Sequence, residues 1–255
     1  MKRIVTALVL LPIVVWVVLA SPGWVFDAVL IIIGLFAFHE FDQIAASQGI
    51  GRAGIPGMAA GIALLFAPNP EVTVVLVALV AMTLALRAND LKKVFPSAGA
   101  FLLGVVYIFG AWRCARGLRD INPHWLMVAL LVSWAGDTAA YYAGRGFGRR
   151  KMAPLVSPGK TWEGAAGSVV GGVVAAAIYT HYFIPVFPMW GATAIACGAN
   201  IAGQVGDLCE SALKRGGGIK DSGTTLPGHG GWLDRIDSSL FSIPAVYAAL
   251  KFIVQ

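Results

Sequence analysis

The most polar stretch of the chain runs from residue 207 to residue 237 and holds nine charged residues in 31 positions, in a sequence that is only 13% charged. Its acids are Asp207, Glu210, Asp221, Asp234 and Asp237, and its bases are Lys214, Arg215, Lys220 and Arg235. Several carboxylates without a Cys/His cage suit a hard cation such as Mg²⁺, which takes one or two carboxylates together with substrate phosphates. The basic side chains offer complementary charge to phosphoryl oxygens. This stretch therefore predicts metal-assisted phosphate chemistry.

A second polar segment, 144–163, contains Gly159-Lys160-Thr161, which is like the end of a Walker A loop. That motif also requires a glycine at position 154, where this chain has Pro154, and a preceding strand. The P-loop interpretation therefore fails. Basic side chains beside glycines can still hold a polyphosphate or a lipid phosphate, although part of this charge is explained by membrane topology.

Two carboxylates lie at membrane depth. Asp137 sits in an apolar helical segment, and its stripe continues through Tyr141 and Gly144 at i+4 and i+7. Such a charge is costly unless it faces a partner or a wet cavity; a structural salt bridge is the alternative. Glu40 follows His39 near the inner end of a span, either at the headgroup boundary or facing the bundle interior. A zinc-protease HExxH motif is excluded because position 43 is glutamine.

The elements that position these residues are apolar helices. At 58% hydrophobic and a mean hydropathy of +0.76, the chain predicts an all-α, polytopic transmembrane helical bundle. We expect a single integral membrane domain, 1–255, with hydrophobic spans in 1–123 and the catalytic half in 124–255. The nine expected spans are Ile4–Ala20, Trp24–Ile44, Ile55–Ala67, Val72–Leu86, Ala98–Arg113, His124–Ala143, Gly164–Phe183, Met189–Gly206 and Ser239–Val254.

Charge distribution predicts the orientation of these spans. With the N-terminus inside, fifteen basic residues fall in inner segments and four in outer ones, as the positive-inside rule requires. Both polar segments then face the cytoplasm from the bacterial cytoplasmic (inner) membrane. The net charge of +6 is explained by topology and anionic lipid heads, so we expect no nucleic-acid partner.

Local patterns refine the expected structure. Asp207, Ser211, Lys214 and Arg215 predict a polar helical face that leaves the eighth span and ends at glycines 216–218. Asp234 and Asp237, at i and i+3, predict one face of a helix that leads into the last span. The small residues of 164–177 indicate close helix packing in lipid, and the same face could equally pack a homodimer.

The segment from Ser211 to Asp237 closely resembles the signature of the phosphatidate cytidylyltransferases. It reads S-x-L-K-R-x4-K-D-x-G-x2-L-P-x-H-G-G-x2-D-R-x-D. The motifs D-T-x-A-Y-x2-G-R from Asp137 and S-P-x-K-T-x-E-G from Ser157 are also similar to the family, whereas the N-terminal third matches only in being hydrophobic. Trp232 replaces an aliphatic residue or Phe, and Gly159 replaces a commonly basic residue, which leaves Lys160 as the expected cation of that motif.

The resemblance implies that CTP and phosphatidic acid react, with Mg²⁺ and possibly a second cation, to give CDP-diacylglycerol and pyrophosphate in the bilayer. Asp221 with Asp234 or Asp237 is expected to hold Mg²⁺. The expected catalytic residues are Asp221, Lys220, Ser222, His229 and Arg235. The expected substrate-binding residues are Lys160, Ser211, Lys214, Arg215, Asp137, Tyr141 and Arg145.

Three other functions are weighed against this one. CDP-alcohol phosphotransferases carry a DGxxAR array followed by GxxxDxxxD, which is absent from this sequence. A CTP-dependent polyprenol kinase would share the nucleotide and the membrane but not the HGGxxDRxD segment. A phosphate-lipid transporter or scaffold predicts no CTP-dependent release of pyrophosphate, and the chain shows no convincing inverted repeat.

Overall fold

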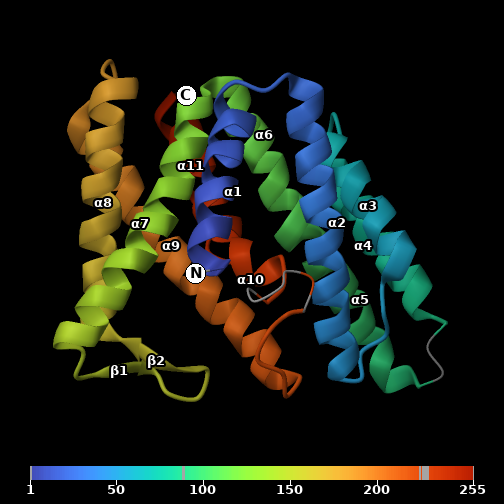
Figure 1. The fold of residues 1–255 in the computed structure, drawn as a ribbon. Helices are drawn as coiled ribbons and strands as arrows, with labels where there is room; N and C mark the ends of the chain where they lie inside the picture. The colour runs from blue at the N-terminus through green and yellow to red at the C-terminus, as the bar shows by residue number, and fades with distance from the viewer. Residues whose placement is uncertain (1, 88–89, 224, 226–229, 255) are drawn as a thin grey trace. The chain divides into compact units, whose positions relative to one another are not determined.

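The computed structural model describes residues 2–87, 90–223, 225 and 230–254. The protein is an all-α polytopic membrane bundle with one small hairpin (Figure 1). The elements are α1 (Lys2–Leu19), α2 (Gly23–Ser47), α3 (Gly54–Phe66), α4 (Pro70–Ala85), η1 (Leu91–Lys93), α5 (Val94–Gly104), η2 (Val105–Gly110), α6 (Ala111–Ile121), α7 (Pro123–Phe147), β1 (Lys151–Ala153), β2 (Ser157–Thr161), α8 (Trp162–Phe183), α9 (Met189–Gly216), α10 (Leu233–Ile236) and α11 (Ser239–Val254).

Each of the nine predicted spans coincides with helical structure, but the helices differ in length. Within the described residues, five stretches are long and apolar enough to cross a bilayer: Gly23–Ser47, Leu91–Ile121, Pro123–Phe147, Trp162–Phe183 and Leu233–Ile253. The third and fourth predicted spans are the shorter helices α3 and α4. The eighth, α9, runs ten residues past its predicted end at Gly206, to Gly216, and carries the polar residues of the signature with it.

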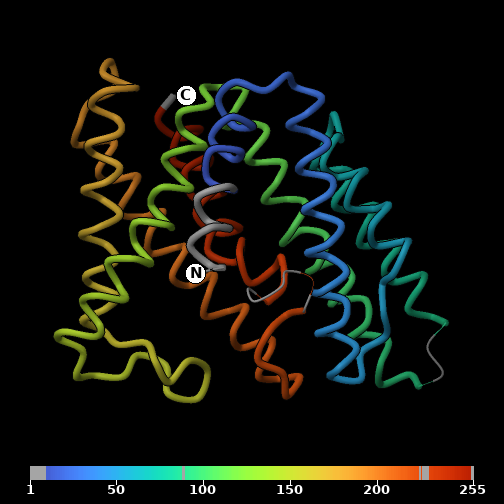
Figure 2. The backbone as a smooth tube through the Cα atoms, in the orientation of Figure 1, coloured from blue at the N-terminus to red at the C-terminus, as the bar shows by residue number. Residues whose placement is uncertain are grey.

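The segment 144–163 differs from the predicted loop. α7 continues to Phe147, and an antiparallel hairpin then pairs β1 with β2, Lys151 opposite Thr161 (Figure 2). The amide of Val156 donates to the carbonyl of Ala153 at 3.2 Å and closes the turn. Spacing that predicts amphipathic helices could not predict this hairpin, because the strands are only three and five residues long.

The second difference concerns the end of the signature. α10 stops at Ile236, and a turn at Asp237 and Ser238 separates it from α11. The prediction that Asp234 and Asp237 share a helical face is therefore wrong. The amide of Ser238 donates to Asp237 Oδ1 at 2.7 Å, and this side-chain bond favours the turn over a continuing helix.

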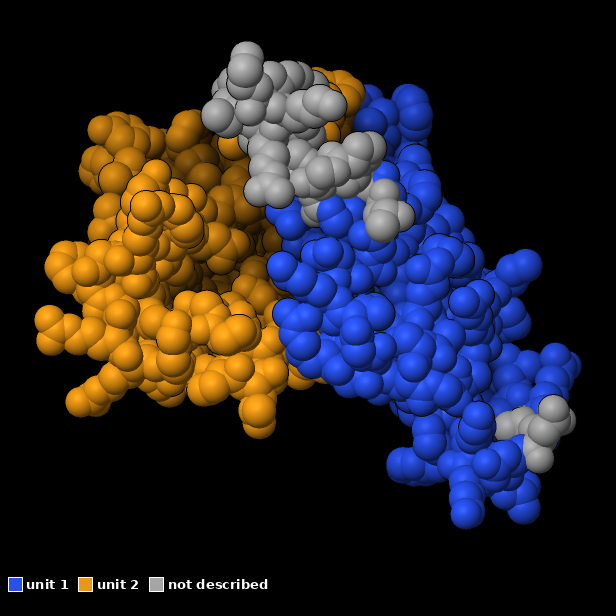
Figure 3. Space-filling model, turned by 60° about the horizontal axis from the view of Figure 1, so that its bottom comes forward, with its two compact units in different colours: residues 1–6, 22–113, 213–235 blue, residues 7–21, 114–212, 236–255 orange. Residues whose placement is uncertain are grey.

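The described backbone forms two compact units, coloured separately in Figure 3. Unit 1 comprises residues 1–6, 22–113 and 213–235, and unit 2 comprises 7–21, 114–212 and 236–255. The chain crosses from one unit to the other inside α9 and α10, so the signature contributes to both.

Unit 1 is packed around aromatic rings that enter gaps left by glycines. Phe38, Phe41 and Phe109 are buried, and the Phe38 ring centroid lies 6.5 Å from that of Phe41 and 5.9 Å from that of Phe109. A Cβ on Gly104 would lie 2.7 Å from the Phe41 ring, closer than real contacts allow. These rings fix α2 against α3, α5 and η2.

Unit 2 is built on the packing of α8 along α7, side by side in Figure 1. A Cβ on Gly164 would lie 3.1 Å from the Ala140 carbonyl, and Cβ atoms on Gly167 and Gly171 would collide with Ala143 and Ala139. The predicted small-residue packing is confirmed, and its partner is α7 of the same chain. The face that could have packed a homodimer is therefore already occupied.

Candidate functional site

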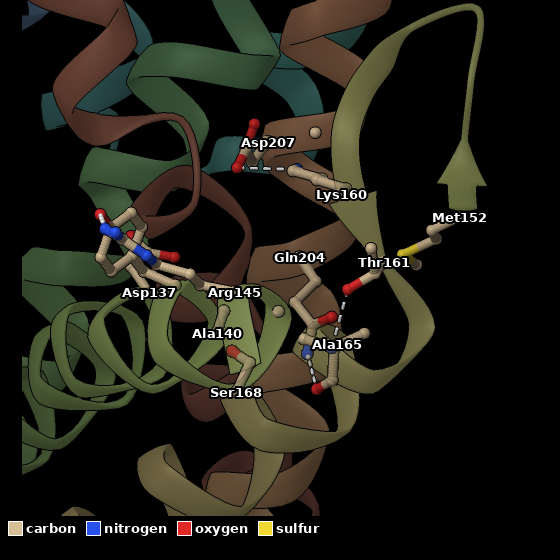
Figure 4. A pocket seen from close by; sticks show the side chains of 14 residues that line it. Asp137, Ala140, Arg145, Met152, Lys160, Thr161, Ala165, Ser168, Gln204 and Asp207 are labelled. Carbon is tan, nitrogen blue, oxygen red and sulfur yellow. Dashed lines mark hydrogen bonds and ion pairs between the residues drawn. The ribbon is translucent and has the colours of Figure 1, made fainter. Parts of the chain in front are cut away.

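A pocket of about 540 Å³ opens in unit 2 between α7, the hairpin, α8 and α9 (Figure 4). Charged side chains line it together with mostly small or apolar residues. The lining residues are Asp137, Ala140, Tyr141, Gly144, Arg145, Met152, Gly159, Lys160, Thr161, Gly164, Ala165, Ser168, Gln204 and Asp207. Four predicted substrate-binding residues, Asp137, Tyr141, Arg145 and Lys160, thus line one cavity. We call it the α7–α8 pocket.

One helical stripe supplies the first wall of the pocket. Asp137, Tyr141 and Gly144 all line it, as their i, i+4, i+7 spacing predicts. Arg145 Nη1 donates to the Tyr141 hydroxyl at 2.9 Å. Gly144 leaves room there, since a Cβ at this position would lie 3.3 Å from Thr161 Oγ1.

The hairpin supplies the opposite wall of the pocket, and its strand β2 carries the cation Lys160. Lys160 Nζ forms an ion pair with Asp207 Oδ2 at 2.7 Å, with about a quarter to a third of each side chain exposed. Thr161 ends β2 and caps α8, because its Oγ1 accepts from the amide of Gly164 at 3.1 Å. Glu163 accepts from the amides of Arg149 and Arg150 at 3.1–3.3 Å. These bonds fix the hairpin where it carries Lys160 into the pocket.

A buried amide network forms the floor. Asn200 Nδ2 donates to the Val132 carbonyl at 3.2 Å and to Ser168 Oγ at 3.1 Å. Gln204 Nε2 donates to Asn200 Oδ1 at 2.7 Å and to the Ala165 carbonyl at 3.2 Å. The network joins α7, α8 and α9, and it holds the three helices in register beneath the charged side chains.

Sequence reasoning missed Asp207, Gln204 and Ser168 as pocket residues. A signal was present in α9, where Asn200, Gln204 and Asp207 recur at i, i+4 and i+7 in an otherwise apolar stretch. Polar residues at this spacing and depth indicate one inward-facing stripe. Two other predicted site residues of unit 2 lie outside the pocket lining. Ser211, near the C-terminal end of α9, donates from Oγ to Asp207 Oδ1 at 3.4 Å. Asp237 lies in the turn before α11.

The remaining signature residues described by the structure lie in unit 1, where Asp234 organises the segment. Its carboxylate receives Lys214 Nζ at 2.5 Å, the amide of Ser222 at 3.0 and 3.2 Å, and the amide of Gly231 at 2.8 Å. Gly230 adopts a φ of 78°, and a Cβ there would lie 2.6 Å from Asp234 Oδ2. Only glycine fits this close approach at a positive φ.

These contacts assign structural roles to several predicted residues. A carboxylate offers about four lone-pair directions, and each oxygen of Asp234 already receives two donors. Metal ligation by Asp234 and phosphate binding by Lys214 stay predictions, and each requires this buried pair to open. Arg215 Nη1 donates to the Ile219 carbonyl at 3.0 Å, next to Gly218, whose φ of 69° ends α9 as predicted.

Three other signature residues are presented outward. Lys220, Asp221 and Arg235 are exposed, and Asp221 accepts no hydrogen bond from any residue in the described ranges of the chain. Ser222 is buried, and its hydroxyl donates to Glu40 Oε2 within unit 1. His229 lies outside the described residues.

The donor set is compatible with a magnesium ion that arrives with its substrate. Within the part of the chain that the structure describes, no three His, Cys, Asp or Glu side chains are grouped to hold a metal. Mg²⁺ needs only one or two protein carboxylates when phosphates supply other ligands. The exposed Asp221 can supply such a carboxylate.

Comparison with known proteins agrees with this chemistry. Residues 1–253 match the model of the Cytidylyltransferase family. A phosphatidate cytidylyltransferase of Pseudomonas aeruginosa is 38% identical over 98% of this chain and 96% of its own length. One from Brucella suis is 34% identical over 96% of this chain and 91% of its own. One from Bacillus subtilis is 38% identical over 68% and 67%. A whole-chain match and a polar pocket among apolar helices lead to one conclusion: this chain is a membrane-embedded enzyme of the cytidylyltransferase family.

Proposed function

We propose that the chain transfers the cytidylyl group of CTP to phosphatidic acid. The observation that carries this proposal is the similarity, over 96–98% of the chain, to proteins named phosphatidate cytidylyltransferase. The α7–α8 pocket supports it, because cations and carboxylates line a cavity whose other walls are small and apolar. The cations can bind phosphate oxygens, and the apolar walls can contact a lipid.

The reaction needs positioning and charge stabilisation more than proton transfer. A phosphate oxygen of phosphatidic acid attacks the α-phosphorus of CTP, the bond from that phosphorus to the β-bridging oxygen breaks, and pyrophosphate leaves. The lipid phosphate is already anionic near neutral pH, so no strong general base is required. Catalysis then rests on holding the two phosphates in line and on stabilising charge that develops on the leaving oxygen.

Lys160 is the pocket residue best suited to that work. It pairs with Asp207 at 2.7 Å while partly exposed, so a phosphate that enters the pocket can replace Asp207 as its partner. Arg145, hydrogen-bonded to the Tyr141 hydroxyl, offers a second cation from the opposite wall, on α7. A preformed pair keeps Lys160 in place before substrate binds, which lowers the entropy cost of positioning it.

We further propose Mg²⁺ as the cofactor, with Asp221 as a protein ligand. When bound, Mg²⁺ would neutralise phosphate charge and polarise the reacting phosphorus. Lys220 and Arg235, exposed like Asp221, would contact phosphoryl oxygens. The predicted roles of Asp237 and of a second cation are retained as part of this proposal.

The proposed location is the bacterial cytoplasmic membrane, with both polar segments facing the cytoplasm, where CTP is found. The distribution of basic residues in the sequence supports this orientation. A homodimer also stays a prediction, and it would need a surface other than the α8 glycine face.

A single labelling experiment tests the function. Purified protein in lipid nanodiscs receives CTP labelled at the α-phosphorus, MgCl₂ and phosphatidic acid. We expect label in the lipid fraction together with one equivalent of pyrophosphate. Label that remains in CDP, with the lipid phosphorylated, would indicate a CTP-dependent kinase instead. Binding of lipid without turnover of CTP would indicate a transporter or scaffold.

A further inference from the structure

The side chain of Glu40, on α2, is buried inside unit 1 and receives four donors from the signature. Glu40 as a whole is only 2% exposed. Oε1 accepts from Thr225 Oγ1 at 2.6 Å and from the amide of Trp232 at 3.1 Å. Oε2 accepts from Ser222 Oγ at 3.0 Å and from the amide of Leu233 at 2.9 Å. One residue of the N-terminal third thus accepts hydrogen bonds from four residues of the signature: Ser222, Thr225, Trp232 and Leu233.

Two signature glycines are required by this carboxylate. A Cβ on Gly223 would lie 2.7 Å from Glu40 Oε1, and a Cβ on Gly231 would collide with Oε2 and with the Ser222 hydroxyl. The backbone can therefore approach Glu40 only where it has no side chains. The Trp232 ring adds a second attachment to α2, because it stacks on Phe36 with 5.8 Å between ring centroids.

The pattern of donors requires acceptors on both oxygens. Each oxygen faces one hydroxyl and one backbone N–H, and a backbone N–H cannot reverse its role. A glutamine at this position would place its NH₂ group against the amide of either Trp232 or Leu233, whichever way it turned. The site is therefore specific for a carboxylate and distinguishes it from an amide of the same shape.

We propose that Glu40 is a positioning residue for cytidylyl transfer: it acts through Ser222 and the amides of Trp232 and Leu233 to fix the segment that presents Lys220 and Asp221. This inference rests on the proposed function for its catalytic consequence. Its structural part, the attachment of the signature to α2, stands independently. In this attachment the Ser222 hydroxyl has a structural role, as a hydrogen-bond donor to Glu40.

The test is Glu40→Gln in the full-length protein in nanodiscs, read by hydrogen–deuterium exchange and by steady-state kinetics with CTP and phosphatidic acid. We expect the amides of 230–236 to exchange about tenfold faster, and kcat to fall about 10- to 100-fold, because a buried donor is left unsatisfied. If the wild-type protein fails to turn over CTP, the proposed function fails, while the exchange measurement still decides the attachment.

The matched control is Asp42→Asn, a buried carboxylate two residues away on the same helix. Asp42 accepts from the amides of Ala53 and Gly54 at 2.7 and 3.1 Å at the start of α3, and it forms no hydrogen bond with the described residues of the signature. It should lower thermal stability without changing exchange at 230–236 or kcat. Equal effects of the two substitutions would overturn the proposal, as would unchanged exchange in Glu40→Gln.

A second pair keeps the test decisive if Glu40→Gln does not fold. Thr225→Val removes one hydroxyl donor to Oε1, and Thr225→Ser keeps it. We expect Thr225→Val to lower kcat about 3- to 10-fold and to speed exchange at 230–236, and Thr225→Ser to stay within about twofold of wild type. Identical behaviour of the two variants would refute the role of the hydroxyl and of Glu40.

Discussion

Lys160→Met should separate activity from stability, because the ion pair that Lys160 makes is worth little to the fold. Lys160 Nζ lies 2.7 Å from Asp207 Oδ2, with side-chain exposures of 27% and 30%. Screening by water limits such a pair to about 0–1 kcal/mol of stability. Methionine retains the apolar length of the lysine, so the wall of the pocket keeps its shape.

The loss of activity should be much larger. A charged hydrogen bond to a phosphate oxygen contributes about 1.5–3 kcal/mol, which corresponds to about a 10- to 150-fold change in rate. We therefore expect kcat/KM for CTP to fall by that factor. The melting temperature should fall by no more than about 2–4 °C.

The assay is initial-rate release of pyrophosphate in nanodiscs, paired with thermal unfolding of the same preparation. Lys151→Met is the matched control, since Lys151 lies on the same hairpin, in β1, but outside the residues that line the pocket. The double variant Lys160→Met/Asp207→Asn removes the unpaired carboxylate. It should recover the lost stability while activity stays low.

Two results would refute the reasoning. Lys160→Met with at least half of the wild-type kcat/KM would show that the lysine does not contact substrate in the rate-limiting complex. Recovery of activity in the double variant would show that the defect came from the uncompensated Asp207 and not from a lost phosphate contact.

Three further predictions concern the metal, the signature and helix packing. Removal of divalent cations with EDTA should abolish turnover, and MgCl₂ should restore it; activity that survives chelation would contradict the proposed cofactor. Asp221→Asn should abolish turnover at an unchanged melting temperature, whereas Asp234→Asn should also lower stability by about 3–5 kcal/mol, since it breaks a buried pair; equal melting temperatures would contradict this division. Gly167→Ala should destabilise the protein by about 1–3 kcal/mol because its Cβ meets Ala143 on α7, while Gly198→Ala, with open space around it, should not lower the melting temperature.

The helical elements could be read from the sequence because membrane helices depend on local composition. A helix in lipid needs an apolar run and satisfies its own backbone, so each predicted span coincides with helical structure. The stripe of Asp137, Tyr141 and Gly144 was predictable for the same reason, since helical periodicity alone puts these residues on one face. The β1–β2 hairpin was not, because Glu163 joins its two ends by accepting from the amide of Arg149, 14 positions earlier in the chain.

The amino-acid sequence by itself determined the fold class and the family, and it determined the residue types that the chemistry needs. Only the tertiary structure decided how those residues divide their work. In the sequence, Asp221 and Asp234 are equivalent carboxylates of one signature. In the fold, Asp234 is enclosed by Lys214, Ser222 and Gly231, whereas Asp221 is exposed. Glu40 bonds to Ser222 across 182 positions of sequence. No local pattern encodes such a contact, because it exists only when the folded backbone brings donors and acceptor together away from water.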